Sequence, residues 1–180
     1  YGVRWRMPQE FSKVRFYGRG PWENYCDRKD GAVFGIYSCD VDDMYTPYVR
    51  PQENGHRVDV RWLEIKNEKG RGLVVFAMDK EFEFNALHNS VEDFDTEESD
   101  APYQWNNFVE NDPHDIGRAR NVMKKQTHVC DISPRDFTEI CIDSRMTGVG
   151  GDNSWGAETY EKYKVLTSEP QRLKFKIIPF

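Results

Sequence analysis

The 180-residue sequence has no apolar run of about 18 residues, the length that a membrane-spanning helix requires. It also lacks a clustered basic face: 25 basic residues stand against 31 acidic ones, which gives a net charge of −6. A nucleic-acid-binding surface needs concentrated positive charge to meet the phosphates. We therefore expect neither a membrane partner nor a nucleic-acid partner.

Signatures of metal and nucleotide sites are absent as well. The four cysteines show no CxxC spacing, and the four histidines form no i, i+4 pair. The glycines at 148–151 are not followed by the lysine of a phosphate-binding loop. We predict no metal, no cofactor and no catalytic residue in this chain. All four cysteines are predicted to be buried free thiols: Cys26, Cys39, Cys130 and Cys141.

What the sequence does contain is a series of short strand-like segments. Alternating apolar and polar residues are typical of strands with one buried face, and a continuous apolar run is typical of a central strand. Segment 73–78 is such a run, and we predict that both its faces are covered. Together the segments predict an all-β, antiparallel β-sandwich. They are 3–7, 14–17, 58–63, 73–78, 137–142, 160–166 and 172–177.

The middle of the chain lacks strand periodicity. Residues 90–101 hold six acidic side chains, which is typical of a solvated loop, and 115–125 predict a short basic helix. We interpret 1–180 as a single β-sandwich domain that contains one long irregular acidic insertion at 90–126. The sequence also starts inside a strand-like segment, from which we expect a fragment of a longer protein.

A glycine-rich stretch stands out near the end of the chain: Gly148-Val149-Gly150-Gly151-Asp152-Asn153-Ser154-Trp155-Gly156. Glycine permits backbone angles that other residues avoid, and Asp, Asn and Ser fix turns through their side chains. A loop of this composition presents Trp155 either as a platform for a sugar face or as a ring buried in the core. Asp152 and Asn153 lie beside the ring and are candidate binding residues, although turn chemistry favours a loop-shaping role for both.

Carboxylates are plentiful, but their spacing does not identify a catalytic pair. A glycosidase needs two carboxyl groups at a set separation, which sequence distance in a β-fold does not provide. We interpret five of them as members of structural ion pairs that hold irregular loops. These are Glu23, Asp27, Glu53, Asp59 and Asp152, with Arg19, Arg28, Arg50, Arg57 and Arg61 nearby in sequence.

Three stretches carry a resemblance to a known family. Residues 20–28 read GPWENYCDR and resemble the pattern GP-x-EN-Y-x-DR; residues 43–55, with Arg57 and Arg61-Trp62 after them, resemble YTPYV-x-P-x-ENG; residues 148–155 resemble G-x-GGD-x-SW. These patterns belong to the C-terminal domain of large β-galactosidases of glycoside hydrolase family 2, the small-chain or fifth-domain type. The three occur in the family's order and extend over most of the chain.

The resemblance implies a two-sheet antiparallel supersandwich of the galactose mutarotase-like type within a larger bacterial enzyme. That enzyme would hydrolyse terminal β-D-galactosides by a retaining mechanism. The family's catalytic acids and its magnesium and sodium ligands belong to other domains, so this chain alone is expected to be inactive. The tryptophan of the third motif, Trp155 here, stacks on substrate in the family.

The implied partners are a β-galactoside substrate, the other domains of the parent enzyme and further copies of that enzyme in a homo-oligomer. The resemblance leaves the compartment open between cytoplasm and periplasm. Two departures from the family pattern are a longer, more acidic segment at 91–125 and a start partway through the expected strands.

Two alternatives come from other functional classes. A stand-alone aldose 1-epimerase needs an acid and a base that face each other across a sugar pocket, and His56 beside Glu53 is its candidate pair. A galactoside-binding module would need measurable affinity of the free domain for its sugar.

Overall fold

The computed structural model describes residues 1–94, 128–151, 153 and 156–180. It divides into two compact units. The first consists of Tyr1–Thr46, Asn54–His88 and Asp136–Phe180, and the second of Pro47–Glu53 and Asn89–Arg135. The predicted basic helix at 115–125 and most of the predicted insertion at 90–126 lie outside the described residues.

The described residues form short strands and single-turn 3-10 helices. The strands are β1 (Gly2–Pro8), β2 (Lys13–Gly20), β3 (Val33–Asp40), β4 (Arg57–Val60), β5 (Trp62–Lys66), β6 (Gly72–Ala77), β7 (Phe82–Leu87), β8 (Phe137–Asp143) and β9 (Phe175–Pro179). The 3-10 helices are η1 (Val41–Met44), η2 (Val91–Asp93), η3 (Val129–Asp131) and η4 (Glu161–Tyr163). None of these helices has the length or the apolar character to span a bilayer.

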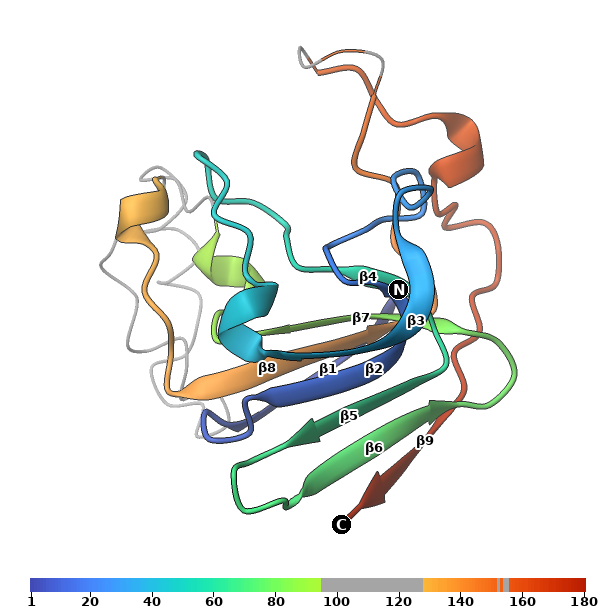
Figure 1. Cartoon of the computed structure of the whole chain (residues 1–180). Helices are drawn as coiled ribbons and strands as arrows, with labels where there is room; N and C mark the ends of the chain where they lie inside the picture. The colour runs from blue at the N-terminus through green and yellow to red at the C-terminus, as the bar shows by residue number, and fades with distance from the viewer. Residues whose placement is uncertain (95–127, 152, 154–155) are drawn as a thin grey trace, which may run out of the picture. The chain divides into compact units, whose positions relative to one another are not determined.

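All the described strands lie in the first unit and pair into two antiparallel sheets (Figure 1). The four-stranded sheet has the order β1-β8-β7-β4, and the five-stranded sheet the order β3-β2-β5-β6-β9. In the first sheet Val3 pairs with Ile142, and Ile142 with Phe84. In the second, Phe16 pairs with Leu63. The prediction of an all-β antiparallel sandwich is confirmed.

The core lies between the two sheets. Phe16 on β2 and Phe84 on β7 are both fully buried, and their rings meet edge to face with centroids 5.2 Å apart. Aromatic rings bury large apolar areas, and the edge-to-face arrangement adds to that stabilisation. Other buried apolar residues of the strands are Val14, Val58, Val60, Leu63, Ile65, Val75, Phe82, Ala86, Ile140 and Ile142.

One predicted strand is in fact two strands that belong to different sheets. The alternating segment 58–63 contains the end of β4, which pairs with β7, and the start of β5, which pairs with β2 and β6. Asp59 has a φ of 55°, a left-handed conformation that is uncommon outside glycine. The chain therefore turns from one sheet into the other without interrupting the alternation of polar and apolar side chains.

The burial of two strands near the C-terminal edge was predicted wrongly. Strand β6 was expected to be covered on both faces, yet of its six residues only Val75 is buried. Strand β9 was expected to bury one face, yet Ile177 is 43% exposed and Ile178 39%. Strand β9 is the outer strand of its sheet (Figure 1), and none of its residues is buried. Segment 160–166 contains η4 in place of the expected strand.

The cysteines differ from the prediction in burial. All four are free thiols, but Cys130 is exposed and Cys26, Cys39 and Cys141 are half-buried. Burial raises the pKa of the Cys26 and Cys39 thiols, because a thiolate is poorly solvated there.

In the second unit, the beginning of the acidic run is not a solvated loop. Asp93 is 2% exposed and pairs with Arg135, while its Oδ2 accepts the backbone N–H of Ser90 at 2.9 Å. Asn89 Nδ2 donates to the Ser133 carbonyl oxygen at 2.8 Å. For these residues the solvated-loop prediction was wrong, because the carboxylate is matched by a cation and an amide.

Candidate functional site

The 21–32 loop follows β2 and is held at its start by a buried guanidinium. Arg57, 3% exposed, donates from Nε and Nη2 to the Pro21 carbonyl oxygen at 3.1 and 3.0 Å. It also donates from Nη1 to the Gly55 carbonyl oxygen at 2.8 Å. Burial lowers the pKa of Arg57, since its charge is kept from water, and the carbonyl oxygens compensate part of that cost. The Gly20–Pro21 turn, whose peptide is cis, is thereby tied to β4.

Asn24 fixes the next part of the same loop. Its side chain is buried, and Nδ2 donates to the carbonyl oxygens of Arg19 and Trp22 at 3.1 and 2.9 Å. Its Oδ1 accepts the backbone N–H of Val58 at 3.1 Å. The backbone N–H of Asn24 donates to the His56 carbonyl oxygen at 2.8 Å. One amide therefore satisfies several buried backbone groups at once, which no apolar side chain of that size can do.

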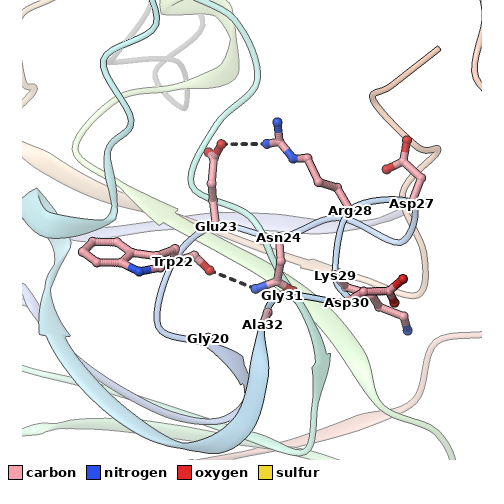
Figure 2. A pocket seen from close by; sticks show the side chains of 10 residues that line it. All are labelled: Gly20, Trp22, Glu23, Asn24, Asp27, Arg28, Lys29, Asp30, Gly31 and Ala32. Carbon is pink, nitrogen blue, oxygen red and sulfur yellow. Dashed lines mark hydrogen bonds and ion pairs between the residues drawn. The ribbon is translucent and has the colours of Figure 1, made fainter. Parts of the chain in front are cut away.

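Glu23 joins the first and second of the family-like stretches. Its Oε1 lies 2.8 Å from Arg28 Nη2 (Figure 2), and its Oε2 accepts the backbone N–H of Gly55 at 2.9 Å. Gly55 has a φ of 77°, and a Cβ there would stand 2.8 Å from the Met44 carbonyl oxygen. Glycine is required at this position for both reasons.

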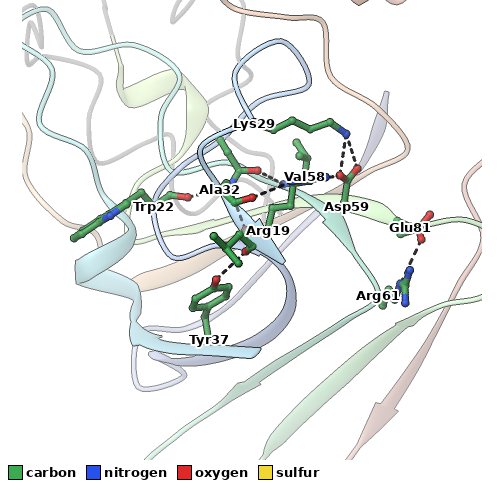
Figure 3. Close-up of polar contacts among 11 residues, drawn as sticks. Arg19, Trp22, Lys29, Ala32, Tyr37, Val58, Asp59, Arg61 and Glu81 are labelled. Atoms are coloured by element: carbon green, nitrogen blue, oxygen red, sulfur yellow. Dashed lines mark hydrogen bonds and ion pairs between the residues drawn. The ribbon is translucent and has the colours of Figure 1, made fainter. Parts of the chain in front are cut away.

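The far end of the loop is held by a charge cluster on Asp59 (Figure 3). The Asp59 carboxylate lies 2.6 Å from Arg19 Nε and 2.8 Å from Lys29 Nζ. Arg19 Nη1 also donates to the Ala32 carbonyl oxygen at 3.0 Å. Burial alone would raise the pKa of Asp59, but the hydrogen bonds from Lys29 and Arg19 outweigh it and lower that pKa.

Asp27 connects the 21–32 loop to the glycine-rich loop (residues 148–156). Its Oδ2 accepts the backbone N–H of Gly150 at 2.8 Å and lies 3.5 Å from the Thr159 hydroxyl. A Cβ at Gly148 would stand only 2.6 Å from the same oxygen, so this approach requires glycine. The first and third family-like stretches, which are more than a hundred residues apart in the sequence, meet at this carboxylate.

The predicted binding residues follow this anchor in the sequence. Asn153 is exposed, whereas Asp152 and Trp155 lie outside the described residues. The base of the loop is close-packed, because a Cβ at Gly151 would stand 2.3 Å from the Ala157 carbonyl oxygen. Gly156 has a φ of 93°, which again favours glycine. The roles of Asp152, Asn153 and Trp155 in binding remain predictions.

His56 does not have the geometry of an epimerase base. Its ring is 1% exposed, stacks on Tyr25 with centroids 5.4 Å apart, and lies 3.0 Å through Nε2 from Glu83 Oε2. The same Glu83 oxygen accepts the backbone N–H of Met146 at 2.7 Å. An acid–base residue must reach its substrate, and this histidine is enclosed by the fold. The pair instead joins β4 and β7 to the chain that leads into the glycine-rich loop.

Sequence reasoning identified the loops but missed some of the residues that hold them. The prediction that Glu23 and Asp59 form ion pairs is confirmed, with Arg28 and Arg19 as their partners. Asp27, however, binds a backbone amide, and Arg57 binds carbonyl oxygens. The available signal was the side-chain type: Asn, Asp and Arg in a polar stretch are suited to backbone hydrogen bonds, but their partners are far away in the sequence.

Among the described residues, no group of three or more His, Cys, Asp or Glu side chains is arranged to hold a metal ion. Two carboxylates of the 21–32 loop are instead engaged within the chain. Glu23 binds Arg28 and the Gly55 amide, and Asp27 binds the Gly150 amide.

Comparison with known proteins identifies the family of this chain. Residues 1–177 match the family model described as β-galactosidase small chain. The chain is 32% identical over 178 residues to a β-galactosidase of Priestia megaterium and covers 14% of that protein. It is 30% identical over 180 residues to β-galactosidase BgaC of Bifidobacterium adolescentis, and covers 14% of that protein. It is also 28% identical over 179 residues to a β-galactosidase of Streptococcus thermophilus, of which it covers 15%.

Between 98% and 99% of this chain takes part in these three matches, although it spans only about a seventh of each relative's length. The three family-like stretches, which are joined through Glu23 and Asp27, thus lie within a chain that aligns with these relatives over nearly its whole length. The chain belongs to the β-galactosidase small-chain family.

Proposed function

We propose that this chain is a non-catalytic, substrate-positioning domain of a larger β-galactosidase. The enzyme would hydrolyse terminal β-D-galactosides by a retaining mechanism, with its catalytic acids and its magnesium and sodium ions held by other domains. Membership of the small-chain family supports this proposal, as does similarity to β-galactosidases of which the chain covers 14% or 15%. The partners in this proposal are the β-galactoside, the remaining domains and further copies of the enzyme.

The observation that carries the proposal is the attachment of the glycine-rich loop to Asp27. The hydrogen bond to Gly150 and the close approach at Gly148 fix the backbone a few residues before Trp155. A ring presented from a fixed backbone loses little conformational entropy when it stacks on a sugar. Trp155 would supply apolar contact to the sugar face, with Asp152 and Asn153 shaping the loop around it.

Such a contact orients the substrate and takes no part in proton transfer. Retaining hydrolysis needs the sugar to be held against a carboxylate pair, and a ring from an adjoining domain contributes to that orientation. The contact is made in the ground state and in the transition state alike, so its loss should weaken binding more than it slows turnover.

Substitution of Trp155 in the full-length enzyme tests the proposal. We expect Trp155→Ala to raise KM for a chromogenic β-galactoside roughly tenfold while kcat changes about twofold or less, and Trp155→Phe to recover most of the loss. Unchanged kinetics in Trp155→Ala would refute the stacking role. The isolated chain should show no turnover of the same substrate, and appreciable turnover would refute the placement of the catalytic acids elsewhere.

A further inference from the structure

Two strands, β1 and β9, have the sequence pattern of a buried face but no buried residue. In β1, Val3, Trp5 and Met7 alternate with arginines, and in β9, Phe175 and Ile177 alternate with lysines. Such alternation is typical of a strand with one face in the core. Yet no residue of either strand is buried. In β2, where apolar and polar residues also alternate, the burial alternates with them.

The apolar side chains of β1 point toward the space between the two sheets. Val3 pairs with Ile142, and Ile142 with Phe84, so these three side chains lie on one face of the four-stranded sheet. Phe84 meets Phe16 of the other sheet, which identifies this face as the inner one. Ile142 and Phe84 are fully buried, whereas Val3 is 44% exposed. The other apolar residues of β1 share this face, because successive side chains alternate, so the core layer continues to β1 and is open there.

The inner face of the five-stranded sheet ends in the same way. Its central row consists of Phe16, Leu63, Val75 and Ile177, each of which pairs with the next. The first three are fully buried, but Ile177, on the outermost strand β9 (Figure 1), is 43% exposed. Apolar surface that stays in contact with water forgoes the free energy that its burial provides. In both sheets, therefore, a row of core residues ends in an uncovered apolar side chain.

The two strands also present backbone groups on their free sides. Each is the last strand of its sheet, and within the described part of the chain each pairs with a strand on one side only. An edge strand has a row of N–H and C=O groups directed away from its sheet, and these groups are a template for a further strand. Strand β1 is a regular template, because it pairs with β8 in one register from Gly2 to Pro8.

We propose that β1 and β9 are docking edges for β-strands from the rest of the enzyme, which extend the two sheets and complete the core between them. Backbone hydrogen bonds along each edge select a strand as the partner, and the open inner face selects one with an apolar residue at every second position. The docked strands cover the inward apolar side chains of the two edges: Val3, Trp5, Met7, Phe175 and Ile177.

The comparisons support this choice of partner. The relatives contain far more chain than the region that matches, since this chain spans only 14% or 15% of each. The same polypeptide therefore supplies strands at a high effective concentration. That the partner belongs to a β-galactosidase rests on the proposed function; the open edges rest on strand register and exposure.

Photo-crosslinking in the full-length enzyme identifies what covers the two edges. Benzoylphenylalanine, which crosslinks to nearby C–H bonds, replaces Val3 or Ile177 in separate variants, and mass spectrometry identifies the crosslinked peptides. We expect both variants to crosslink to segments outside residues 1–180, with no increase in the mass of the chain. The control position is Ile36, which pairs with Tyr17 and so points away from the core, and which should give no such crosslinks. Crosslinks to residues 95–127, or a product with the mass of two chains, would overturn the proposal.

Hydrogen exchange in the same enzyme supplies a readout of the backbone. In a free antiparallel edge strand, about half of the amides point away from the partner and exchange quickly. We expect these outward amides of β1 and β9 to exchange at least about a hundredfold more slowly than free amides, because docked strands accept their hydrogen bonds. Rapid exchange of half the amides in both strands of wild type would refute the docking.

Substitution then connects the uncovered side chains to that protection. Val3→Asp and Ile177→Asp each place a charge in the covered surface, so each should restore rapid exchange in its own strand. Ile36→Asp, at a 56% exposed position on β3, is the matched control and should leave both strands protected. Equal exchange rates in all three variants would show that the two side chains are not covered in the enzyme.

This proposal and the proposed function fail in different ways. Crosslinks and exchange rates require no turnover, so an enzyme that hydrolyses no β-galactoside would refute the proposed function while the two docking edges are still decided. An active enzyme whose β1 and β9 exchange rapidly would refute the docking edges alone.

Discussion

The sandwich core and the 21–32 loop are stabilised by opposite means. Between the sheets, Phe16 and Phe84 are fully buried and interact through apolar contact alone. Asn24 in the loop and Arg57 beneath it on β4 are almost as deeply buried, but they interact through hydrogen bonds to backbone carbonyl and amide groups. The core is stabilised by buried apolar surface area, whereas the conformation of the loop is fixed by directional hydrogen bonds.

This contrast accounts for where the candidate binding residues lie. Apolar packing is non-directional and tolerates small displacements of a side chain, whereas a buried amide accepts only a narrow range of geometries. A loop that must present a ring at a fixed place is therefore better held by polar side chains. The hydrogen bonds of Asn24 to Trp22 and of Asp27 to Gly150 serve the two loops in the same way.

The largest effect should follow a break in the core. Phe84→Ala removes a fully buried ring and its contact with Phe16, so we expect a loss of about 3–5 kcal/mol in the free energy of unfolding. That is a large part of the stability of a typical domain. Urea denaturation followed by tryptophan fluorescence measures it. Ile36→Ala, at a 56% exposed position on β3, should cost less than about 0.5 kcal/mol, and equal losses in the two variants would contradict the assignment of the core.

A smaller effect should follow a break in the loop. Asn24→Ala leaves the buried Val58 amide and the Trp22 and Arg19 carbonyl oxygens without their partner, so we expect a loss of about 2–3 kcal/mol. Asn24→Asp keeps an acceptor for Val58 but sets a buried carboxylate oxygen against the two carbonyl oxygens, and at neutral pH it should be at least as destabilising as Asn24→Ala. Hydrogen exchange at the Val58 amide should accelerate in Asn24→Ala, and unchanged protection there would contradict the role given to this side chain.

The same contrast explains which parts of the fold the sequence predicts. Strand β2 was predicted correctly because its burial alternates, and β8, most of whose residues are buried, because it carries a compact apolar run. Strand β1 was predicted from its alternating sequence, although none of its residues is buried. Strand β7 was missed: its six residues are all buried, yet they include Glu83 and Asn85. Those polar side chains bond to His56 and to the Asn54 carbonyl group, partners that no local pattern reveals.

Strand β3 was missed for another reason. The contacts within the candidate site could not be predicted for a third reason. In β3 the exposed residues include Val33 and Ile36, so polarity does not report which face is buried. In the 21–32 loop the family-like motif indicated the right residues without their contacts. That Asp27 meets Gly150 depends on the fold of the whole sandwich, because the two residues are 123 positions apart.

Effects on the glycine-rich loop should be smaller in stability and visible in binding. Asp27→Ala removes the acceptor of the Gly150 amide at a half-buried position, so we expect a loss of about 1–2 kcal/mol. Gly148→Ala should have a similar cost, because its Cβ would stand 2.6 Å from Asp27 Oδ2.

In the full-length enzyme both changes should raise KM several-fold with little change in kcat, as expected of residues that position a binding ring. Asp27→Asn keeps a side-chain oxygen for the Gly150 amide and should recover most of the KM. Steady-state kinetics of the three variants, with the Gly150 amide followed by NMR, make the test. If Asp27→Ala kept a normal KM although its Gly150 NMR signal was displaced, the hydrogen bond from Gly150 to Asp27 would not contribute to substrate binding.

The smallest effect concerns the charge cluster that closes the 21–32 loop. Hydrogen bonds from Lys29 and Arg19 hold the folded-state pKa of Asp59 below its ordinary value of 3.8, despite the opposing effect of burial. The carboxylate therefore contributes stability at pH values above 3.8, and that contribution is lost as the pH falls through the folded-state pKa. Because the side chain is 33% exposed, solvent screening limits the contribution to about 1 kcal/mol or less.

Asp59→Asn isolates this charge, because asparagine tolerates the left-handed φ of 55° as well as aspartate does. Urea midpoints of wild type and variant should differ at about pH 6 and converge as the pH falls toward about 2, since wild type alone loses an ion pair over that range. A constant difference down to the lowest pH would mean that Asp59 acts through its shape and not through its charge. In that case the end of the 21–32 loop near Asp59 would be held by its backbone conformation, as the glycine-rich loop is. The evidence that polar bonds hold the loops, in contrast to the apolar core, would then come from Asn24, Arg57 and Asp27.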